Sequence, residues 1–74
     1  MMSKEFDICG IPFVFLYFKN NKAMCRLGDS HQIIDIPKKY FKDDGTLSCN
    51  SNALIWVLNR KDVMYKMRKA LNEI

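Results

Sequence analysis

The sequence has few of the residues that interrupt regular structure, with three Gly and two Pro among 74 residues. Disordered segments are enriched in such residues and poor in bulky apolar ones, whereas 49% of this chain is hydrophobic. We therefore expect a folded chain. Because 74 residues leave room for only one small core, we predict a single domain that spans residues 1–74.

Cysteine and histidine are scarce as well, with three Cys and one His. Cys9, Cys25 and Cys49 form no C-x-x-C pair and no zinc-site spacing, and their odd number argues against a disulfide framework. We expect free thiols, with Cys49 in the polar segment SCNSN as the most reactive. The lone His31 stands in a polar loop and lacks the arrangement of a Ser/His/Asp hydrolase.

The sequence also lacks a phosphate-binding loop and the acidic spacing of a calcium loop. We therefore expect no enzymatic activity, no metal, no cofactor and no small-molecule substrate. The apolar run at residues 13–18 is too short to span a bilayer and no cleavage site follows it, so we expect neither a membrane segment nor a signal peptide. Together with free thiols, this predicts a soluble cytoplasmic protein.

Basic residues exceed acidic ones only modestly. Twelve Lys and Arg against eight Asp and Glu give a formal net charge of +4. Such an excess favours polyanions weakly. Charge alone therefore does not decide between a protein partner and nucleic acid.

The longest apolar run, at residues 13–18, consists of six bulky side chains, FVFLYF. Half-buried antiparallel strands alternate apolar with polar residues, so this run indicates a strand that is buried on both faces or keeps one face for a partner. The run leads to Asn20-Asn21, and Asn tolerates the left-handed conformation of a two-residue hairpin turn. We predict strands near residues 12–19 and 22–27.

A two-residue turn would pair Phe18 with Ala23 and Tyr17 with Met24. Continued without interruption, this register predicts one apolar core face and one mixed face. The predicted core face carries Val14, Leu16, Phe18, Ala23, Cys25 and Leu27. The mixed face carries Phe13, Phe15, Tyr17, Lys19, Lys22, Met24 and Arg26.

A strand is also predicted before this hairpin, in the segment EFDIC that precedes Gly10. A two-residue turn at Gly10-Ile11 would place Phe6 and Ile8 beside Phe13 and Phe15 on the mixed face, with Glu5 and Asp7 over the core. A bulge or a longer loop would reverse this placement, so the register of the first strand stays open.

Another short strand, at residues 32–36, would place Ile34 and Ile36 on the core face. The segment 37–48 predicts a short helical turn and then a loop, with Asp44-Gly45 as its turn.

From residue 51 onward the apolar residues follow helical spacing. The predicted stripe is Ala53, Val57, Met64, Met67, Leu71 and Ile74. Ser51 is the expected N-cap. Residues 59–62 could break the helix into two pieces, with Asp62 capping the second, and residues 53–58 could instead form a strand, because their apolar run has no period.

The predicted fold is therefore α+β. A small antiparallel sheet of three or four strands, at about residues 4–36, is followed by one or two C-terminal helices, at about residues 51–73, packed on one face.

The mixed sheet face is the first candidate site, because one terminal helical region covers only one face of a sheet. A large apolar face is normally covered by a partner or a second copy. The predicted partner-binding residues are Phe13, Phe15, Tyr17, Met24 and Arg26. Exposed rings beside cations could also stack unpaired bases.

Two groups of cations form the second candidate site. The predicted polyanion-binding residues are Lys38, Lys39, Lys42, Lys66, Arg68 and Lys69. The last three could track a phosphate backbone, but cations near a helix C-terminus also favour the helix dipole.

We expect a small cytoplasmic binding protein without enzymatic activity that regulates or inhibits a larger protein partner. The richness in Lys, Asn and Ile agrees with an accessory protein of a phage or a mobile element. The alternatives are a homodimer that covers its own sheet face and a basic nucleic-acid-binding protein that uses the aromatic sheet face and the basic helix.

Overall fold

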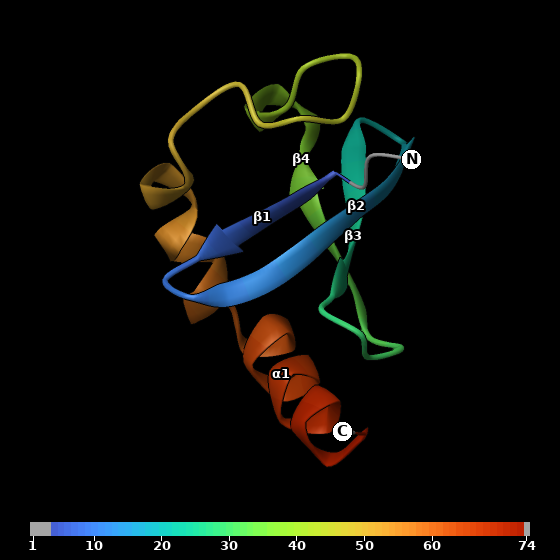
Figure 1. The fold of residues 1–74 in the computed structure, drawn as a ribbon, viewed down its shortest axis with the longest axis vertical. Helices are drawn as coiled ribbons and strands as arrows, with labels where there is room; N and C mark the ends of the chain where they lie inside the picture. Colours follow the sequence, from blue (N-terminus) through green and yellow to red (C-terminus); the bar gives the residue numbers. More distant parts are fainter. Residues whose placement is uncertain (1–3, 74) are drawn as a thin grey trace.

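A computed structural model describes residues 4–73 and shows a four-stranded antiparallel sheet followed by helices (Figure 1). The strands lie in the sheet in chain order, β1-β2-β3-β4. The elements are β1 (Glu5–Ile8), β2 (Ile11–Lys19), β3 (Lys22–Leu27), β4 (Ile33–Pro37), the 3-10 helices η1 (Lys38–Tyr40) and η2 (Ser51–Asn59), and α1 (Lys61–Glu73). The α+β prediction is confirmed, because η2 and α1 pack their buried residues onto one face of the sheet.

Two tight turns shape the sheet. Asn20 and Asn21, with φ of 51° and 63°, join β2 to β3 as predicted. The β1–β2 turn consists of Cys9 and Gly10, with φ of 51° and 81°, so the turn predicted at Gly10-Ile11 lies one residue too late. Positive φ at both central positions gives a turn whose twist matches that of the flanking strands.

A β-bulge in β2 interrupts the predicted register. Next to the turn, Phe18 lies opposite Ala23, as predicted. The register then shifts between Phe15 and Tyr17, and Phe15 lies opposite Cys25. One extra residue in a strand moves every side chain beyond it to the other face of the sheet.

The bulge therefore exchanges the two faces in the first half of β2. Phe13 is 0% exposed and Phe15 packs against the core, on what we call the inner face. Val14 lies opposite Arg26 on the outer face, and Leu16 at the bulge is half-buried. The predictions that Val14 and Leu16 belong to the core and that Phe13 and Phe15 face away from it are wrong. This register buries phenyl rings, which remove more apolar area from water than Val or Leu.

The outer strands add to the inner face. In β1, Phe6 lies opposite Phe13, so Phe6 and Ile8 are on the side of Phe13 as the simple hairpin predicted, but that side is the core. In β4, Ile34 and Ile36 are buried, which confirms the strand predicted at residues 32–36.

All five Phe residues of the chain form one cluster on the inner face. Phe6 stacks on Phe13 with ring centroids 5.4 Å apart. The Phe41 ring lies 5.7 Å from Phe6, 5.9 Å from Phe15 and 6.4 Å from Phe18. Such aromatic pairs add to the stabilisation that comes from buried area alone.

The segment after β4 covers this cluster. It contains η1, the predicted helical turn, and Phe41 pairs with Leu47 across the predicted turn at Asp44-Gly45. Gly45 is buried, with φ of 89°, and a Cβ added there would overlap the Phe15 ring. A residue with a side chain would thus be strained both by its backbone and by its neighbour.

The C-terminal region breaks into two helical segments at Arg60, which was one of the predicted alternatives. The first segment is neither an α-helix nor a strand but the 3-10 helix η2. Its shorter period turns Leu54 and Val57, three residues apart, toward the core. The N-cap is Asn50, whose side chain accepts a hydrogen bond from the Asn52 N–H, so the prediction of Ser51 as N-cap is wrong.

Helix α1 buries Val63 and Ala70 rather than the predicted stripe. Met64 and Leu71 are 44% and 72% exposed, while Met67 is half-buried. In the first segment Val57 is buried as predicted, whereas Ala53 is exposed. The part of the predicted stripe on α1 is displaced because the break at Arg60 restarts the helical period. Ile74, the last residue of that stripe, lies outside the described residues.

Candidate functional site

The predicted partner-binding residues do not form one surface. Phe13 and Phe15 are part of the aromatic cluster on the inner face. Tyr17, Met24 and Arg26 are on the outer face, where Tyr17 is 49% exposed and the other two are half-buried. The outer face thus retains one exposed ring, too little for a platform on which successive bases stack.

The predicted polyanion-binding residues are also separated. Lys38, Lys39 and Lys42 lie at or next to η1, far along the chain from α1. The Lys38 ammonium is 5.0 Å from the centre of the Phe18 ring, and that of Lys39 is 5.3 Å from the centre of Tyr40. These two cations already interact with aromatic faces of the chain itself.

The basic residues of α1 have different roles. Lys66 Nζ donates a hydrogen bond of 2.7 Å to the carbonyl oxygen of Ile33. The Lys69 ammonium lies 5.2 Å from the centre of the Tyr65 ring on the same helix. Arg68 is exposed. The three cations therefore do not present a common phosphate-binding row.

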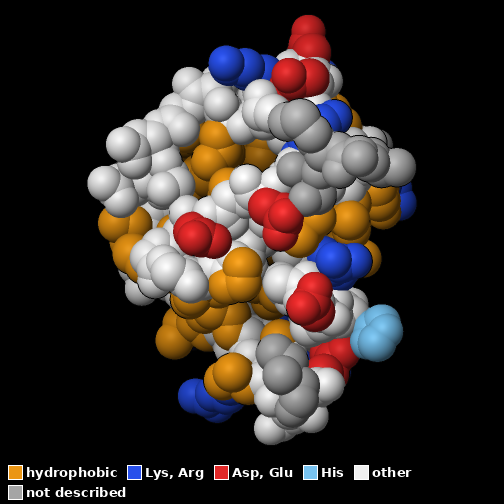
Figure 2. Space-filling model, viewed as in Figure 1, with side chains coloured by type: hydrophobic (Ala, Val, Ile, Leu, Met, Phe, Trp, Pro, Cys, Tyr) orange, Lys and Arg blue, Asp and Glu red, His pale blue; other side chains and the backbone are white. Residues whose placement is uncertain are grey.

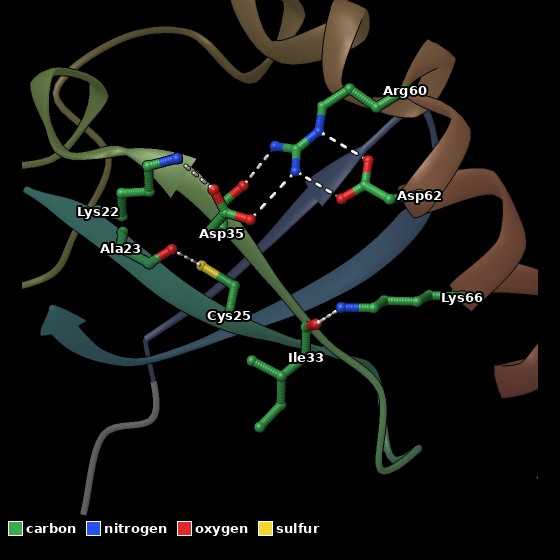
Figure 3. Close-up of polar contacts among 8 residues, drawn as sticks. All are labelled: Lys22, Ala23, Cys25, Ile33, Asp35, Arg60, Asp62 and Lys66. Carbon is green, nitrogen blue, oxygen red and sulfur yellow. Dashed lines mark hydrogen bonds and ion pairs between the residues drawn. The ribbon is translucent and has the colours of Figure 1, made fainter. Parts of the chain in front are cut away.

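Arg60 and Lys66 bind the free edge of β4 (Figure 3). Arg60 donates to the carbonyl oxygen of Asp35 at 2.6 Å and to its carboxylate at 3.1 Å, and it also pairs with Asp62 at 2.7 Å. Edge strands carry unpaired carbonyls that invite another strand. Here side chains satisfy two of these carbonyls, so this polar group closes the edge and holds α1 to the sheet.

The charges at this edge stabilise one another. Partial burial would raise the pKa of Asp35, but the hydrogen bonds and charges of Lys22 and Arg60 outweigh this effect and lower it. The hydrogen bond with Arg60 lowers the pKa of Asp62, and the one with Asp62 raises the pKa of Arg60. Each of these four charged side chains has an oppositely charged partner within the chain, which indicates a structural role.

The other end of α1 is tied to the β3–β4 loop. The Glu73 carboxylate accepts hydrogen bonds from Gln32 Nε2 at 2.6 Å and from the His31 N–H at 2.9 Å, and it contacts His31 Nδ1 at 2.7 Å. These bonds, with Gln32 contributing most, lower the pKa of Glu73 from 4.5 to about 2. The lone histidine is therefore part of an exposed set of hydrogen bonds between the end of α1 and the β3–β4 loop, which we call the clasp of Glu73.

An apolar groove separates α1 from the β1–β2 turn. Its volume is about 300 Å³, and it is lined by Ile11, Pro12, Leu27, Met67 and Leu71 together with small residues. One wall is the turn that precedes β2, the floor is the end of β3, and the other wall is α1. We call this surface the α1 groove.

Large apolar side chains continue the α1 groove onto the open surface. Leu71 is 72% exposed and Met64, two turns before it on the same side of α1, is 44% exposed. Figure 2 shows hydrophobic side chains gathered below the acidic side chains of the sheet, toward the helices, with basic side chains at their lower border. Contiguous apolar surface of this kind marks interaction sites more often than isolated exposed residues do.

The cysteines do not form a reactive centre. Cys25 is fully buried, which confirms its predicted place in the core, and this burial raises its pKa to about 12. Cys49 is half-buried, with its Sγ 3.9 Å from the carbonyl oxygen of Tyr40, whereas Cys9 in the β1–β2 turn is exposed. Among residues 4–73, His, Cys, Asp and Glu form no cluster of three or more that could hold a metal ion.

The α1 groove was missed in the sequence because its residues come from three distant segments. One signal was present: Val63 and Ala70, like Met64 and Leu71, are seven residues apart on α1. Two apolar stripes on one helix indicate that one stripe packs against the core and that the other stays exposed.

No helix within the described range, residues 4–73, has the length and apolar character needed to cross a membrane. Comparisons with protein-family models, with curated proteins and with solved structures found no match to this chain.

Proposed function

We propose that this protein is a small binding protein without enzymatic activity that docks on a larger protein and regulates it through the α1 groove. The observation that carries this proposal is the apolar groove with Met64 and Leu71 exposed at its border. Burying a Leu or Met side chain stabilises a protein or a complex by about 1.5–3 kcal/mol. This chain leaves Met64 and Leu71 exposed and so does not gain that free energy on folding. A partner that covers this stripe would gain that free energy.

Support for the nucleic-acid alternative is weaker. Of the six predicted polyanion-binding residues, Lys38, Lys39 and Lys69 lie over rings of this chain, and Lys66 binds a backbone carbonyl. Cations that are already engaged gain less from a phosphate.

A capture experiment tests the proposed function. The tagged chain is incubated with nuclease-treated extract of its source cells, and any captured protein is then purified and rebound to the purified chain. We expect Leu71→Glu to abolish capture, since it places a charge on the groove border. Tyr17→Glu, the same kind of change at an exposed position on the outer face, should have no effect.

Salt distinguishes the two functions. Binding to phosphates weakens steeply as salt rises, whereas an apolar protein interface weakens little. A protein partner whose binding survives Leu71→Glu, or steeply salt-dependent binding of the purified chain to nucleic acid, would contradict the proposed function.

A further inference from the structure

Most charged residues of α1 already have partners within the chain. Asp62 pairs with Arg60, and Glu73 with the β3–β4 loop. Lys66 binds the edge of β4, and Lys69 lies over Tyr65. These interactions account for the helix surface that faces β4 and for part of the surface that faces solvent.

Two cations remain on α1, Lys61 and Arg68, and both lie beside the apolar stripe of Met64 and Leu71 that continues the α1 groove. Within the described part of the chain, neither Lys61 nor Arg68 forms an ion pair. They are seven residues apart, and Arg68 is four residues after Met64 and three before Leu71, so helical geometry places this cationic row along the solvent side of the apolar stripe. Lys61 stands in the first turn of α1, where a cation opposes the helix dipole, so the helix itself gains nothing from it.

The opposite border of the groove differs in charge. Asp7 lies opposite Pro12 in the β1–β2 ladder, and exposed Asp29 directly follows Gly28. The sheet border also carries one cation, because Arg26 Nε donates to the carbonyl oxygen of Gly28 at 2.7 Å. Its charges are therefore mixed, whereas the helix border carries cations alone. A ligand with charges on one side only would fit it in one orientation.

The backbone around the groove has no place for an added strand. The Gly28 N–H already donates to the carbonyl oxygen of Pro12 at 3.1 Å, and the α1 backbone is bonded within the helix. Recognition must therefore occur through side chains that enter the groove. An amphipathic helix presents apolar side chains in such a row, three and four residues apart.

We propose that the α1 groove binds an amphipathic α-helix of a protein partner, with a row of Asp or Glu along the border that faces Lys61 and Arg68. This inference rests on the proposed function and specifies the partner's contact segment. The other border of the partner helix needs no row of like charges, because it faces both Arg26 and the carboxylates of Asp7 and Asp29. A second copy of this chain fits the groove less well. Its α1, the one α-helix among residues 4–73, carries the same two cations along its exposed border, where the groove favours Asp or Glu.

Synthetic helical peptides test this inference directly. Peptides of about 15 residues are long enough to be partly helical in water. The first has Leu at helical spacing with Glu along one border, the second has Lys in place of Glu, and the third keeps the Glu residues but scrambles the Leu positions. Fluorescence anisotropy with the purified chain at low salt measures their affinities.

We expect the acidic peptide to bind about tenfold tighter than the basic one, the factor expected for two close charge pairs at low salt. The double variant Lys61→Glu/Arg68→Glu should reverse this order. Lys69→Glu makes the same charge change on the same helix but away from the groove, and should leave the order unchanged.

Three results would overturn the inference. They are equal affinity for acidic and basic peptides, equal affinity for the scrambled peptide, and a dimer of the chain that Leu71→Glu dissociates in analytical ultracentrifugation. Equal peptide affinities would leave the proposed function intact, since that function is tested by the Leu71-dependent capture of a natural partner.

Discussion

The two ends of the sheet differ in whether other segments of the chain cover their apolar side chains. At the end near Asn20-Asn21, which we call the closed end, the loop around Gly45 covers the aromatic cluster. At the end near Cys9-Gly10, the open end, no segment of residues 4–73 covers the α1 groove, and Leu71 is 72% exposed. The loop that follows β4 packs at the closed end, and α1 packs beside the open end without covering the groove. This difference supports our proposal that the open end binds another molecule.

The largest expected effect comes from truncating one residue of the aromatic cluster and one residue of the α1 groove. Phe13→Ala should cost about 3–5 kcal/mol, because a fully buried ring leaves a cavity. A chain of this size has about that much stability in total, so this variant should be largely unfolded. Leu71→Ala should change stability by less than about 0.5 kcal/mol. Urea unfolding of both variants measures the difference, and a similar loss for Leu71→Ala would show that the open end is part of the core.

A glycine at each end gives the next comparison. Gly45→Ala should cost about 3 kcal/mol, because the new Cβ meets the Phe15 ring and the positive φ is strained. Gly10→Ala also has a positive φ, but its Cβ would have no neighbour within 4 Å, so the cost should be about 1 kcal/mol. Thermal unfolding compares the two variants. Equal losses would mean that the loop around Gly45 does not pack on the cluster as described.

The two sides of α1 sharpen the comparison, since one side is bound to β4 and the other borders the groove. Arg60→Met removes hydrogen bonds to the backbone and carboxylate of Asp35 and should cost about 1–2 kcal/mol. The pKa of Asp35 should rise, because a cation that lowers it is lost.

Lys22→Met is the matched control. It removes the more exposed ion pair of Asp35 and should cost less than about 0.5 kcal/mol. Denaturant unfolding gives both losses, and an NMR titration gives the pKa of Asp35. If Arg60→Met were as mild as Lys22→Met, the edge of β4 would not be what holds α1.

The smallest effect is expected at the clasp of Glu73. Its pKa in the folded chain lies below its ordinary value of 4.5, so the fold favours the ionised carboxylate. The stabilisation is therefore fully present above about pH 4.5 and is lost as the pH falls toward about 2. NMR should show the last turn of α1 loosening over this range. In Glu73→Gln the last turn should already be loose at neutral pH, and a wild-type pKa near 4.5 would contradict the clasp.

The sequence predicted most of the sheet because its turns and strands have local signals. Asn20-Asn21 marked the hairpin, and the alternation of Ile34 and Ile36 marked the inward side of β4. The bulge had no such signal. Since every residue from Phe13 to Phe18 is apolar, a shift of one position leaves the pattern equally apolar, and only packing of the rings selects the register.

The sequence predicted what kind of surface the candidate site is, but not where it lies. An excess of apolar surface over covering helix was expected, but it was assigned to the sheet face with Phe13 and Phe15. The bulge turns those two rings to the inner face, and the uncovered surface lies instead beside Leu71. That location depends on the break at Arg60, which sets the rotation of α1, and on the position of the β1–β2 turn. Both are consequences of tertiary packing.

The most direct test of the central claim is site-specific photocrosslinking in the source cells. A photoreactive phenylalanine analogue replaces Leu71 in one variant and Tyr17 in another, because both positions are exposed and lie on different surfaces. The account predicts a discrete adduct with another protein from position 71, lost when Arg68→Glu is added, and none from position 17. Adducts from position 17 alone, or only crosslinks between copies of this chain, would contradict it.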